Sequence, residues 1–365
     1  MRIALLAQEV SPTYNGGGIG TYTAYLAEGL CELGHDVTVV GRHDGPWTER
    51  DGVVYAPRVH LPRRGRYPTL ADRLEAAIEV RRAVKRLGSF DVIEGPDWLA
   101  EAAFLPRDSA TVHARHIHGN HQVLREHAGW LPDRQQRLAE RFESRDLARA
   151  DVITAASHLS TRLPNGVAVT PGVPRIVPMP VRAMHARPVP DERVVTQLGR
   201  IEARKGPEVL LAAAALVGDV TVRFVGRDTE HPDGGSYAAA LRRQARVPVE
   251  FPGPCGAGDV PDVIAASRVV AVPSRFEPYS VVALEALAGG RPVVLSDACG
   301  AAEVLTEDHG AYVFPEGDAE ALAAHLSRLL DDPGPGHRGP VHVRTHHSPR
   351  AAAAAKVAVW RDFLG

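Results

Sequence analysis

The chain has 365 residues, which at about 150 residues per domain predicts two domains. Hydrophobic residues make up 44% of it and charged residues 24%, which is the composition of a globular protein. Its 42 basic and 44 acidic side chains give a net charge of −2, which argues against binding nucleic acid or an anionic membrane through bulk charge. No stretch approaches the roughly 18 apolar residues of a membrane span, and three scattered cysteines, too few for a disulfide framework, indicate a cytoplasmic protein.

The first half of the chain alternates short Ile- and Val-rich runs with longer segments of helical spacing. The runs predict strands at Arg2–Ala7, Asp36–Val40, Asp91–Glu94, Ala110–Arg115 and Asp151–Thr154. The longer segments predict helices at Gly20–Leu33, Ala71–Leu87 and Arg134–Ala148. Continuous apolar strands that alternate with helices predict a parallel sheet covered on both faces.

The same pattern starts again after Thr170–Pro190, where six prolines in one stretch exclude a helix interior or a central strand and indicate a linker. Strands are predicted at Arg193–Leu198, Val220–Val225, Pro248–Phe251, Val269–Val272 and Pro292–Leu295. Helices are predicted at Pro207–Val217, Ser236–Ala245, Val260–Ser267, Tyr279–Ala288, Asp318–Leu330 and, at the end of the chain, Ser348–Leu364. The prediction is an α/β protein of two doubly wound domains, residues 1–175 and 190–345, with residues 346–365 packing back on the first.

A glycine-rich loop, residues 15–21, follows the first predicted strand and opens the first helix. Glycines such as Gly17 and Gly18 let backbone N–H groups approach an anion at a helix N-terminus. The dinucleotide motif G-x-G-x-x-G fails because Thr21 occupies its last position, and the second strand ends without an acidic residue for a ribose. A nicotinamide cofactor is therefore disfavoured, while a tight turn without a ligand stays an alternative.

Two glutamates, Glu277 and Glu285, follow the strand that ends near Pro273. Pro278 suits the first position of a helix, which would put Glu285 two turns along it and about 12 Å further on. Carboxylates at that separation do not share a proton; they suit a long ligand such as a nucleotide-sugar, bound where the carboxyl ends of the strands meet. Solvated helix residues are the alternative interpretation.

Residues 273–303 resemble the signature of glycosyltransferase family 4, whose E-x7-E element is matched by Glu277 and Glu285. The stretch from Gly199 to Gly206 resembles the family's G-R-x4-K-G motif, and the glycine loop at residues 16–20 matches in order. The resemblance implies a GT-B fold, in which two Rossmann-like domains face a cleft, and a retaining, metal-independent transferase. It also implies a nucleotide-sugar substrate and no cofactor.

The resemblance further assigns roles to single residues. Arg200 and Lys205 would bind the donor diphosphate, Glu285 the ribose and Glu277 the sugar near its anomeric carbon. The N–H groups of three residues at the start of the helix would contact phosphate: Ser280, Val281 and Val282. The physics agrees, because cations and a helix N-terminus stabilise a departing diphosphate without a metal ion.

The histidine of the family active site is expected after a strand of the first domain. His118, which precedes Gly119, fits that setting best, and His116 is the second candidate. Its implied role is to contact the donor sugar and orient the acceptor. With His113 and His121 nearby, a metal site is a less favoured reading. The histidines at 337, 342, 346 and 347 are interpreted as solvated surface.

The expected function is transfer of a hexose or N-acetylhexosamine from a UDP-sugar to a hydroxyl acceptor, by a monomer or homodimer. Loops at Arg58–Thr69 and His121–Asp133 would shape the acceptor site. A small-molecule acceptor is favoured over a cell-envelope glycan or lipid, since no amphipathic docking helix stands out. A nucleotide-sugar epimerase on the same fold is the alternative enzyme.

Overall fold

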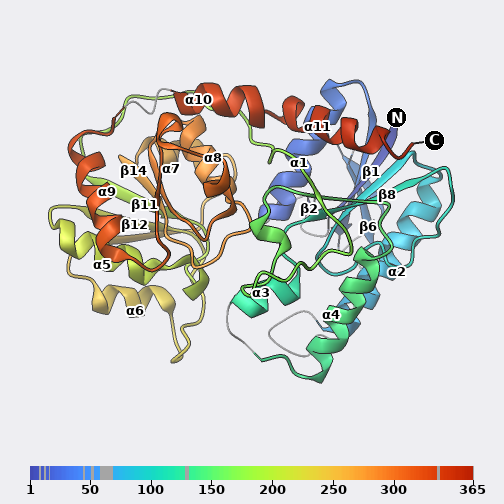
Figure 1. The fold of residues 1–365 in the computed structure, drawn as a ribbon, viewed down its shortest axis with the longest axis horizontal. Coiled ribbons are helices and arrows are strands. Elements are labelled where there is room, and N and C mark those ends of the chain that lie inside the picture. The colour runs from blue at the N-terminus through green and yellow to red at the C-terminus, as the bar shows by residue number, and fades with distance from the viewer. Residues whose placement is uncertain are drawn as a thin grey trace. The chain divides into compact units, whose positions relative to one another are not determined.

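The chain divides into two units that are described separately (Figure 1): unit 1 is Met1–Pro180 together with Pro349–Gly365, and unit 2 is Val181–Ser348. The structure is a computed structural model, and it describes residues 1–7, 10–11, 14–15, 17–43, 46–50, 53–57, 69–127, 131–334 and 338–364. Within these residues, no helix has the length and apolar character that crossing a membrane requires.

Unit 1 is built on a sheet of eight described strands in the order β10-β9-β8-β7-β1-β4-β6-β5. Every pair is parallel except β5 with β6. The strands are β1 (Arg2–Leu6), β4 (Asp36–His43), β5 (Thr48–Arg50), β6 (Val53–Pro57), β7 (Val92–Pro96), β8 (Val112–Ile117), β9 (Val152–Ala155) and β10 (Arg175–Ile176). A small antiparallel pair, β2 (Val10–Ser11) and β3 (Tyr14–Asn15), precedes the first helix.

Five helices of unit 1 are described: α1 (Gly17–Glu32), α2 (Leu70–Leu87), α3 (His121–His127), α4 (Arg134–Leu147) and α11 (Pro349–Arg361). Helix α2 begins where it does because Thr69 and Asp72 form a capping box that satisfies first-turn N–H groups. The C-terminal helix α11 packs along α1 (Figure 1), so the end of the chain returns to the first domain as predicted. The packing is close, since a Cβ at Gly29 would lie 1.9 Å from the carbonyl oxygen of Pro349.

Unit 2 contains a six-stranded, fully parallel sheet in the order β13-β12-β11-β14-β15-β16. The strands are β11 (Val194–Leu198), β12 (Thr221–Val225), β13 (Val249–Gly253), β14 (Val269–Val272), β15 (Val293–Ser296) and β16 (Ala311–Phe314). The helices are α5 (Pro207–Val217), α6 (Tyr237–Gln244), α7 (Val260–Ala265), α8 (Val281–Ala288), α9 (Ala319–Asp331) and α10 (Gly339–His342). Its main core joins strand side chains such as Phe224 to Leu210 of α5 and Leu326 of α9, all nearly inaccessible to solvent.

The two sheets share one topology. In each sheet, the first strand lies in the middle, the next strands add to one side of it, and the later strands add to the other side. The point where the strand order reverses, the topological switch, lies between β1 and β7 in unit 1 and between β11 and β14 in unit 2. This is the doubly wound arrangement predicted from the sequence, and ligands of such sheets bind at the carboxyl ends of the strands beside the switch. The fold therefore predicts one candidate ligand-binding site in each unit.

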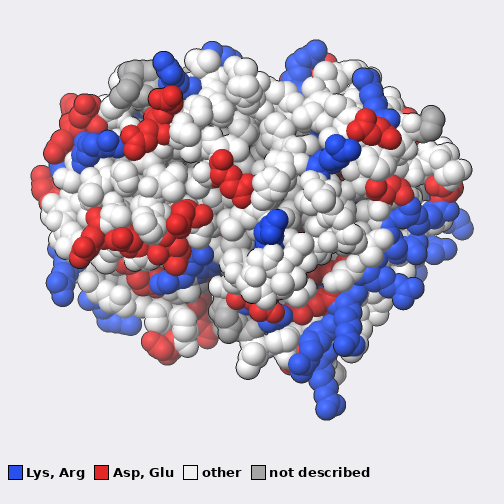
Figure 2. All heavy atoms as spheres, in the orientation of Figure 1, with Lys and Arg blue, Asp and Glu red and all other residues white. Residues whose placement is uncertain are grey.

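The sequence analysis missed several short elements and misjudged one surface. Strands β6 and β16 were not predicted, and His121–His127 is helix α3 rather than loop. His347 is buried and His342 half-buried, so the solvated interpretation is wrong for both. His342 ends α10, His347 ends the π-helical turn Val343–His347, and both of these segments pack against α8. On the face drawn in Figure 2, charges of both signs are mixed, and basic side chains gather along α4, where Arg134, Arg137, Arg141 and Arg145 are exposed.

Candidate functional site

Unit 2 has a hollow at its topological switch. It encloses about 210 Å³, open solvent included, and we call it the unit 2 hollow. Its lining comes from the ends of β11 and β14, from the loops that follow them and from the start of α8. Ligands of doubly wound sheets usually bind at this place, beside the topological switch. The lining residues are Gln197, Leu198, Lys205, Ala271, Val272, Pro273, Ser274, Ser280 and Val282.

An ion-pair cluster connects the two loops beside this hollow. The Lys205 ammonium binds the Glu277 carboxylate, and Arg204 Nη1 lies 3.3 Å from the same oxygen. Burial alone would raise the pKa of Glu277, but the charges of Lys205 and Arg204 outweigh it and lower that pKa to about 2. Glu277 is therefore ionised at neutral pH, where it has no proton to donate and is a weak base.

Close backbone approach brings these loops together. Gly206 has φ +61°, and a Cβ on it would lie 2.0 Å from the carbonyl oxygen of Pro273 at the end of β14. Arg275 N–H donates to the Arg204 carbonyl at 2.8 Å, and Arg204 Nη1 donates to the Phe276 carbonyl at 2.9 Å. A glycine at 206 is thus required for Lys205 to reach Glu277.

Helix α8 begins later than the sequence suggested. Ser280, with φ +93°, is its N-cap, and the Ser280 hydroxyl accepts the Ala283 N–H at 3.2 Å. Pro278 is not the first helical residue, because backbone hydrogen bonds hold the preceding loop against the segment after β15, including Glu277 N–H to the Ala298 carbonyl at 3.0 Å. The first-turn N–H groups of Val281 and Val282 have no acceptor within the helix, and Val282 lines the unit 2 hollow.

Glu285 therefore lies one turn into α8 rather than two. Its side chain is buried, and this burial raises its pKa to about 7. The pKa values of the two glutamates of the E-x7-E stretch are thus shifted in opposite directions, since that of Glu277 is lowered to about 2 and that of Glu285 is raised to about 7. Arg200 differs from Lys205, because its side chain is 52% exposed and lies 3.4 Å from Glu202 in an ion pair.

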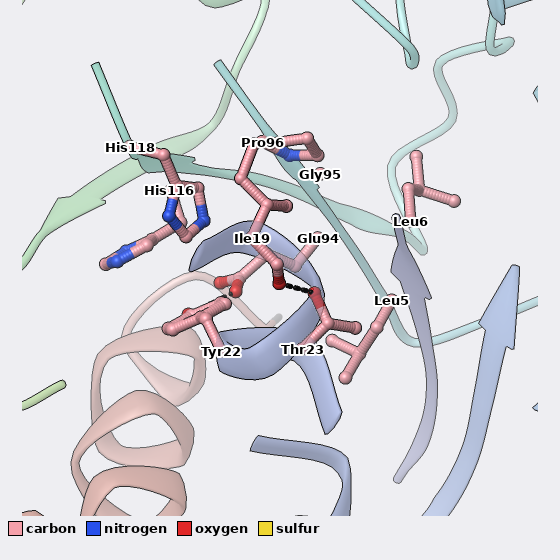
Figure 3. Close-up of a pocket in the computed structure, with 10 residues that line it drawn as sticks. All are labelled: Leu5, Leu6, Ile19, Tyr22, Thr23, Glu94, Gly95, Pro96, His116 and His118. Atoms are coloured by element: carbon pink, nitrogen blue, oxygen red, sulfur yellow. Dashed lines mark hydrogen bonds between the residues drawn. The ribbon is translucent and has the colours of Figure 1, made fainter. Parts of the chain in front are cut away.

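Unit 1 has a second hollow at its own switch, between the ends of β1 and β7 (Figure 3). This unit 1 hollow of about 220 Å³, open solvent included, is lined by Leu5, Leu6, Ile19, Tyr22, Thr23, Glu94, Gly95, Pro96, His116 and His118. Gly17 and Gly18 stand just before this lining, at the start of α1, where Gly17 has φ +68° and Gly18 is exposed. The neighbouring Gly16 lies outside the described residues.

Both candidate histidines line the unit 1 hollow. His118 is half-buried, and Asp97 accepts its backbone N–H at 2.8 Å. Burial, and then the charge of Lys356, lower the pKa of His118 to about 3, so its imidazole is neutral at physiological pH. His116 is almost fully buried behind it, and the two rings meet edge to face with centroids 4.7 Å apart. His118 is thus the one of the pair that is accessible.

The sequence analysis did not find three side chains that surround these histidines. Tyr22 Oη donates to Glu94 Oε1 at 2.7 Å (Figure 3), and Lys356 Nζ of α11 donates to Glu94 Oε2 at 2.7 Å. The sequence does carry one indication that Lys356 is special, because the chain contains only three lysines, Lys85, Lys205 and Lys356. Lys205 lines the unit 2 hollow, and Lys356 contacts Glu94 and His116, which line the unit 1 hollow.

Parts of the predicted acceptor site cannot be placed. Residues 58–68 of the Arg58–Thr69 loop and residues 128–130 of the His121–Asp133 loop lie outside the described residues. Across the part of the chain that the structure describes, no group of three or more His, Cys, Asp or Glu side chains is placed to hold a metal ion.

Two Rossmann-like units, each with a hollow at its strand switch, define a GT-B fold, and comparisons with known proteins place the chain within it. Residues 17–178 match the family Glycosyl transferase 4-like domain, and residues 192–332 match Glycosyl transferases group 1. The chain is 30% identical to a D-inositol 3-phosphate glycosyltransferase of Salinispora tropica, over 91% of this chain and 79% of that protein. This chain therefore belongs to the group 1, family 4-like glycosyltransferases, and it is an enzyme of the transferase class.

Solved structures share the fold. Sucrose-phosphate synthase from Thermosynechococcus elongatus matches with a TM-score of 0.81 and 22% identity, over 99% of this chain and 98% of that one. HepE from Anabaena in complex with UDP-glucose matches with a TM-score of 0.71 and 19% identity, over 99% of this chain and 100% of that one.

Proposed function

We propose that this glycosyltransferase is a retaining enzyme that transfers a hexose or N-acetylhexosamine from a UDP-sugar to a hydroxyl group of a small-molecule acceptor, without a metal ion. The observation that carries the proposal is the unit 2 hollow, where Lys205 and the start of α8 supply positive charge for a diphosphate. The name D-inositol 3-phosphate glycosyltransferase, borne by the relative from Salinispora tropica, supports a small polyol acceptor. The UDP-glucose bound to HepE supports a uridine donor.

In the proposed reaction, the bond between the anomeric carbon and the β-phosphate oxygen breaks, and a bond from the acceptor oxygen to the same carbon forms. The acceptor proton passes to the departing phosphate oxygen. Neither Glu277 nor His118 is a good proton acceptor, because Glu277 is paired with Lys205 and the pKa of His118 is lowered to about 3. Arg200, Lys205 and the N–H groups of the α8 start, Ser280 included as N-cap, would stabilise the charge that develops on the diphosphate.

The remaining roles are those that the family resemblance implies. Glu285 would accept hydrogen bonds from the ribose, and Glu277 would face the sugar carbon as it becomes cationic. His118 would hydrogen-bond the sugar as a neutral imidazole, and Gly17 and Gly18 would let the start of α1 approach the donor. Nothing in this set of roles needs a cofactor.

One assay tests the proposal. The enzyme is incubated with a panel of nucleotide-sugars and with polyol, lipid and glycan acceptors, with and without EDTA, and nucleotide diphosphate and product anomers are measured. We expect UDP release that depends on the acceptor and survives EDTA, with the α-anomer formed from an α-linked donor. Epimerised donor without UDP release would instead indicate the epimerase, and transfer only to lipid or glycan acceptors would indicate an envelope enzyme. An inverted product would overturn the retaining assignment.

A further inference from the structure

Lys356 is the most unusual buried residue of unit 1. Its side chain is only 1% exposed, although an ammonium group loses strongly favourable hydration when it is buried. The chain otherwise relies on arginine: of its 42 basic residues, only Lys85, Lys205 and Lys356 are lysines. A lysine kept in the interior therefore calls for a structural reason of its own.

The surroundings of Lys356 match the shape of an ammonium group. Its Nζ atom lies 2.7 Å from Glu94 Oε2, 2.6 Å from Thr154 Oγ1 and 3.0 Å from His116 Nδ1. These acceptors belong to β7, β9 and β8, so the ammonium group of α11 contacts three neighbouring strands of the sheet. Three donors meet three acceptors, which suits an ammonium and not the planar fork of an arginine.

Lys356 is connected to His118 through two aromatic rings, those of Tyr22 and His116. The second oxygen of Glu94 accepts the Tyr22 hydroxyl at 2.7 Å, and the Tyr22 ring stacks on His116 with centroids 4.5 Å apart and planes within 2° (Figure 3). His118 then packs edge-on against both rings, with each centroid distance 4.7 Å. The orientation of the His118 ring is thus determined by two rings that Lys356 holds, one directly and one through Glu94.

We propose that Lys356 is a positioning residue of the transferase: its ammonium fixes the rings of His116 and Tyr22 and thereby holds His118 in the orientation that sugar transfer requires. The proposal rests on the proposed function of His118. It also fixes a proton position. Because an ammonium can only donate, His116 Nδ1 accepts and its proton is on Nε2.

The test uses the full chain and a charge-compensated variant. Lys356→Met alone would leave the buried Glu94 carboxylate unpaired, which can unfold the protein, so the main variant is Lys356→Met with Glu94→Gln. The matched control is Lys85→Met, which removes an exposed lysine of α2. Each protein is compared below its thermal unfolding transition, and dispersed NMR signals from unit 1 are used to show that this unit is folded.

The first measurement needs no activity. Histidine ring ¹⁵N spectra should show His116 of the wild type as the Nε2–H tautomer with a hydrogen-bonded Nδ1, and in the double variant the ring signals of His116 and His118 should move. The second measurement is kinetic. Since the lysine orients His118 and does not bind donor, we expect kcat to fall by about tenfold or more while donor Kd stays within about twofold. The control should match the wild type in both.

The outcomes separate the two proposals. If the wild type transfers sugar but the double variant keeps wild-type kcat, or its His118 signals do not move, the positioning role is wrong and the proposed function stands. If donor Kd rises along with the loss of kcat, Lys356 acts on general stability and the positioning role is again wrong. If the wild type transfers no sugar, the proposed function fails, and the spectra still decide whether Lys356 fixes the His116 tautomer.

Discussion

At the scale of single residues, the most informative feature is the pairing of Lys205 with Glu277. The sequence predicted that both belong to a donor site, but it assigned Lys205 to the diphosphate and Glu277 to the sugar. Their ion pair, and the part that Arg204 takes in it, could not be predicted, because they depend on how the loop after β11 folds against the loop after β14. Spacing along the chain carries no information about that contact.

Lys205 should matter more for donor affinity than Arg200 does. Its ammonium is 17% exposed against 52% for Arg200, and charged hydrogen bonds are stronger where water is partly excluded. We expect Lys205→Ala to raise the Kd for UDP by roughly ten- to hundredfold and Arg200→Ala to raise it less. Titration calorimetry measures both, with Arg275→Ala as the control because Arg275 pairs with Glu316 at the surface. Equal Kd values for wild type and Lys205→Ala would remove Lys205 from the donor site.

Glu277 should affect catalysis rather than binding. A carboxylate beside the anomeric carbon is worth most when that carbon becomes cationic, so Glu277→Gln should lower kcat by roughly 10²-fold. UDP should still bind at least as well, because the substitution releases Lys205 from its ion pair. Steady-state kinetics and UDP titration measure the two effects, and Glu316→Gln provides an exposed control. A variant that keeps its kcat, or that loses UDP, contradicts this role.

Glu285 makes donor binding depend on pH. Its pKa is raised to about 7 by burial, while ribose hydroxyls bind the ionised carboxylate more strongly, so donor affinity rises as pH rises through that value. The Kd for UDP-glucose should fall by up to about tenfold between about pH 6 and about pH 8, and Glu285→Gln should remove the dependence. UDP-glucose is the right probe because its diphosphate has no group that titrates in this range. A flat wild-type profile would show that Glu285 does not contact the ribose.

The same shift affects folding with the opposite sign. Between the ordinary glutamate pKa of 4.5 and about 7, the folded state holds a proton on Glu285 that the unfolded state has released. Stability from this group therefore decreases as pH rises through that window.

At the scale of elements, the sequence predicted most strands and helices within a few residues, because their apolar runs and caps are strong local signals. Helix α5 occupies Pro207–Val217 as predicted. The start of α8 was wrong because Ser280 adopts φ +93°, a backbone conformation that nothing in the local sequence indicates and that the contacts of the preceding loop impose. Strand β16 was missed because its Ala-Tyr-Val-Phe run holds one valine and no isoleucine, whereas β14 and β15, of the same length, contain two or more valines.

The loop that carries Lys205 depends on a glycine. Gly206→Ala would meet the Pro273 carbonyl at 2.0 Å, so the loop must shift and Lys205 with it. We expect a loss of roughly 3 kcal/mol or more in unfolding free energy and a weaker affinity for UDP. The control is Gly317→Ala, which also has a positive φ of +79° but nothing within 4 Å of the added Cβ, and which should lose only about 1 kcal/mol. Denaturant unfolding and UDP titration compare them, and equal losses would show that backbone conformation, not the clash, governs this position.

At the scale of the whole molecule, the chain crosses between its units twice, after Pro180 and after Ser348. The alternation of strands and helices was enough to predict two doubly wound domains and the returning helix. It could not predict that Lys356 of this helix is buried against Glu94, because a single lysine in a helix usually lies on the solvated face.

Unit 2 is one continuous segment of the chain, whereas unit 1 is made of two separate segments. We expect residues 181–348 to fold alone and bind UDP-glucose. Residues 1–180 alone should not reach a native fold, because they lack α11, whose Trp360 is fully buried, and they leave Glu94 without its ammonium. Adding a segment of residues 349–364, as a peptide or through a glycine–serine linker, should restore dispersed NMR signals. A well-dispersed spectrum from residues 1–180 alone would contradict this expectation.

The return of the chain to unit 1 also sets an order of events during protein synthesis. Domains usually fold in the order in which they leave the ribosome. Here the unit that is translated first is completed last, since Lys356 follows the whole of unit 2. A nascent chain can therefore hold a finished unit 2 while the rings around His118 still lack the charge that orients them, and a chain that stops short of α11 would bind a sugar nucleotide without using it.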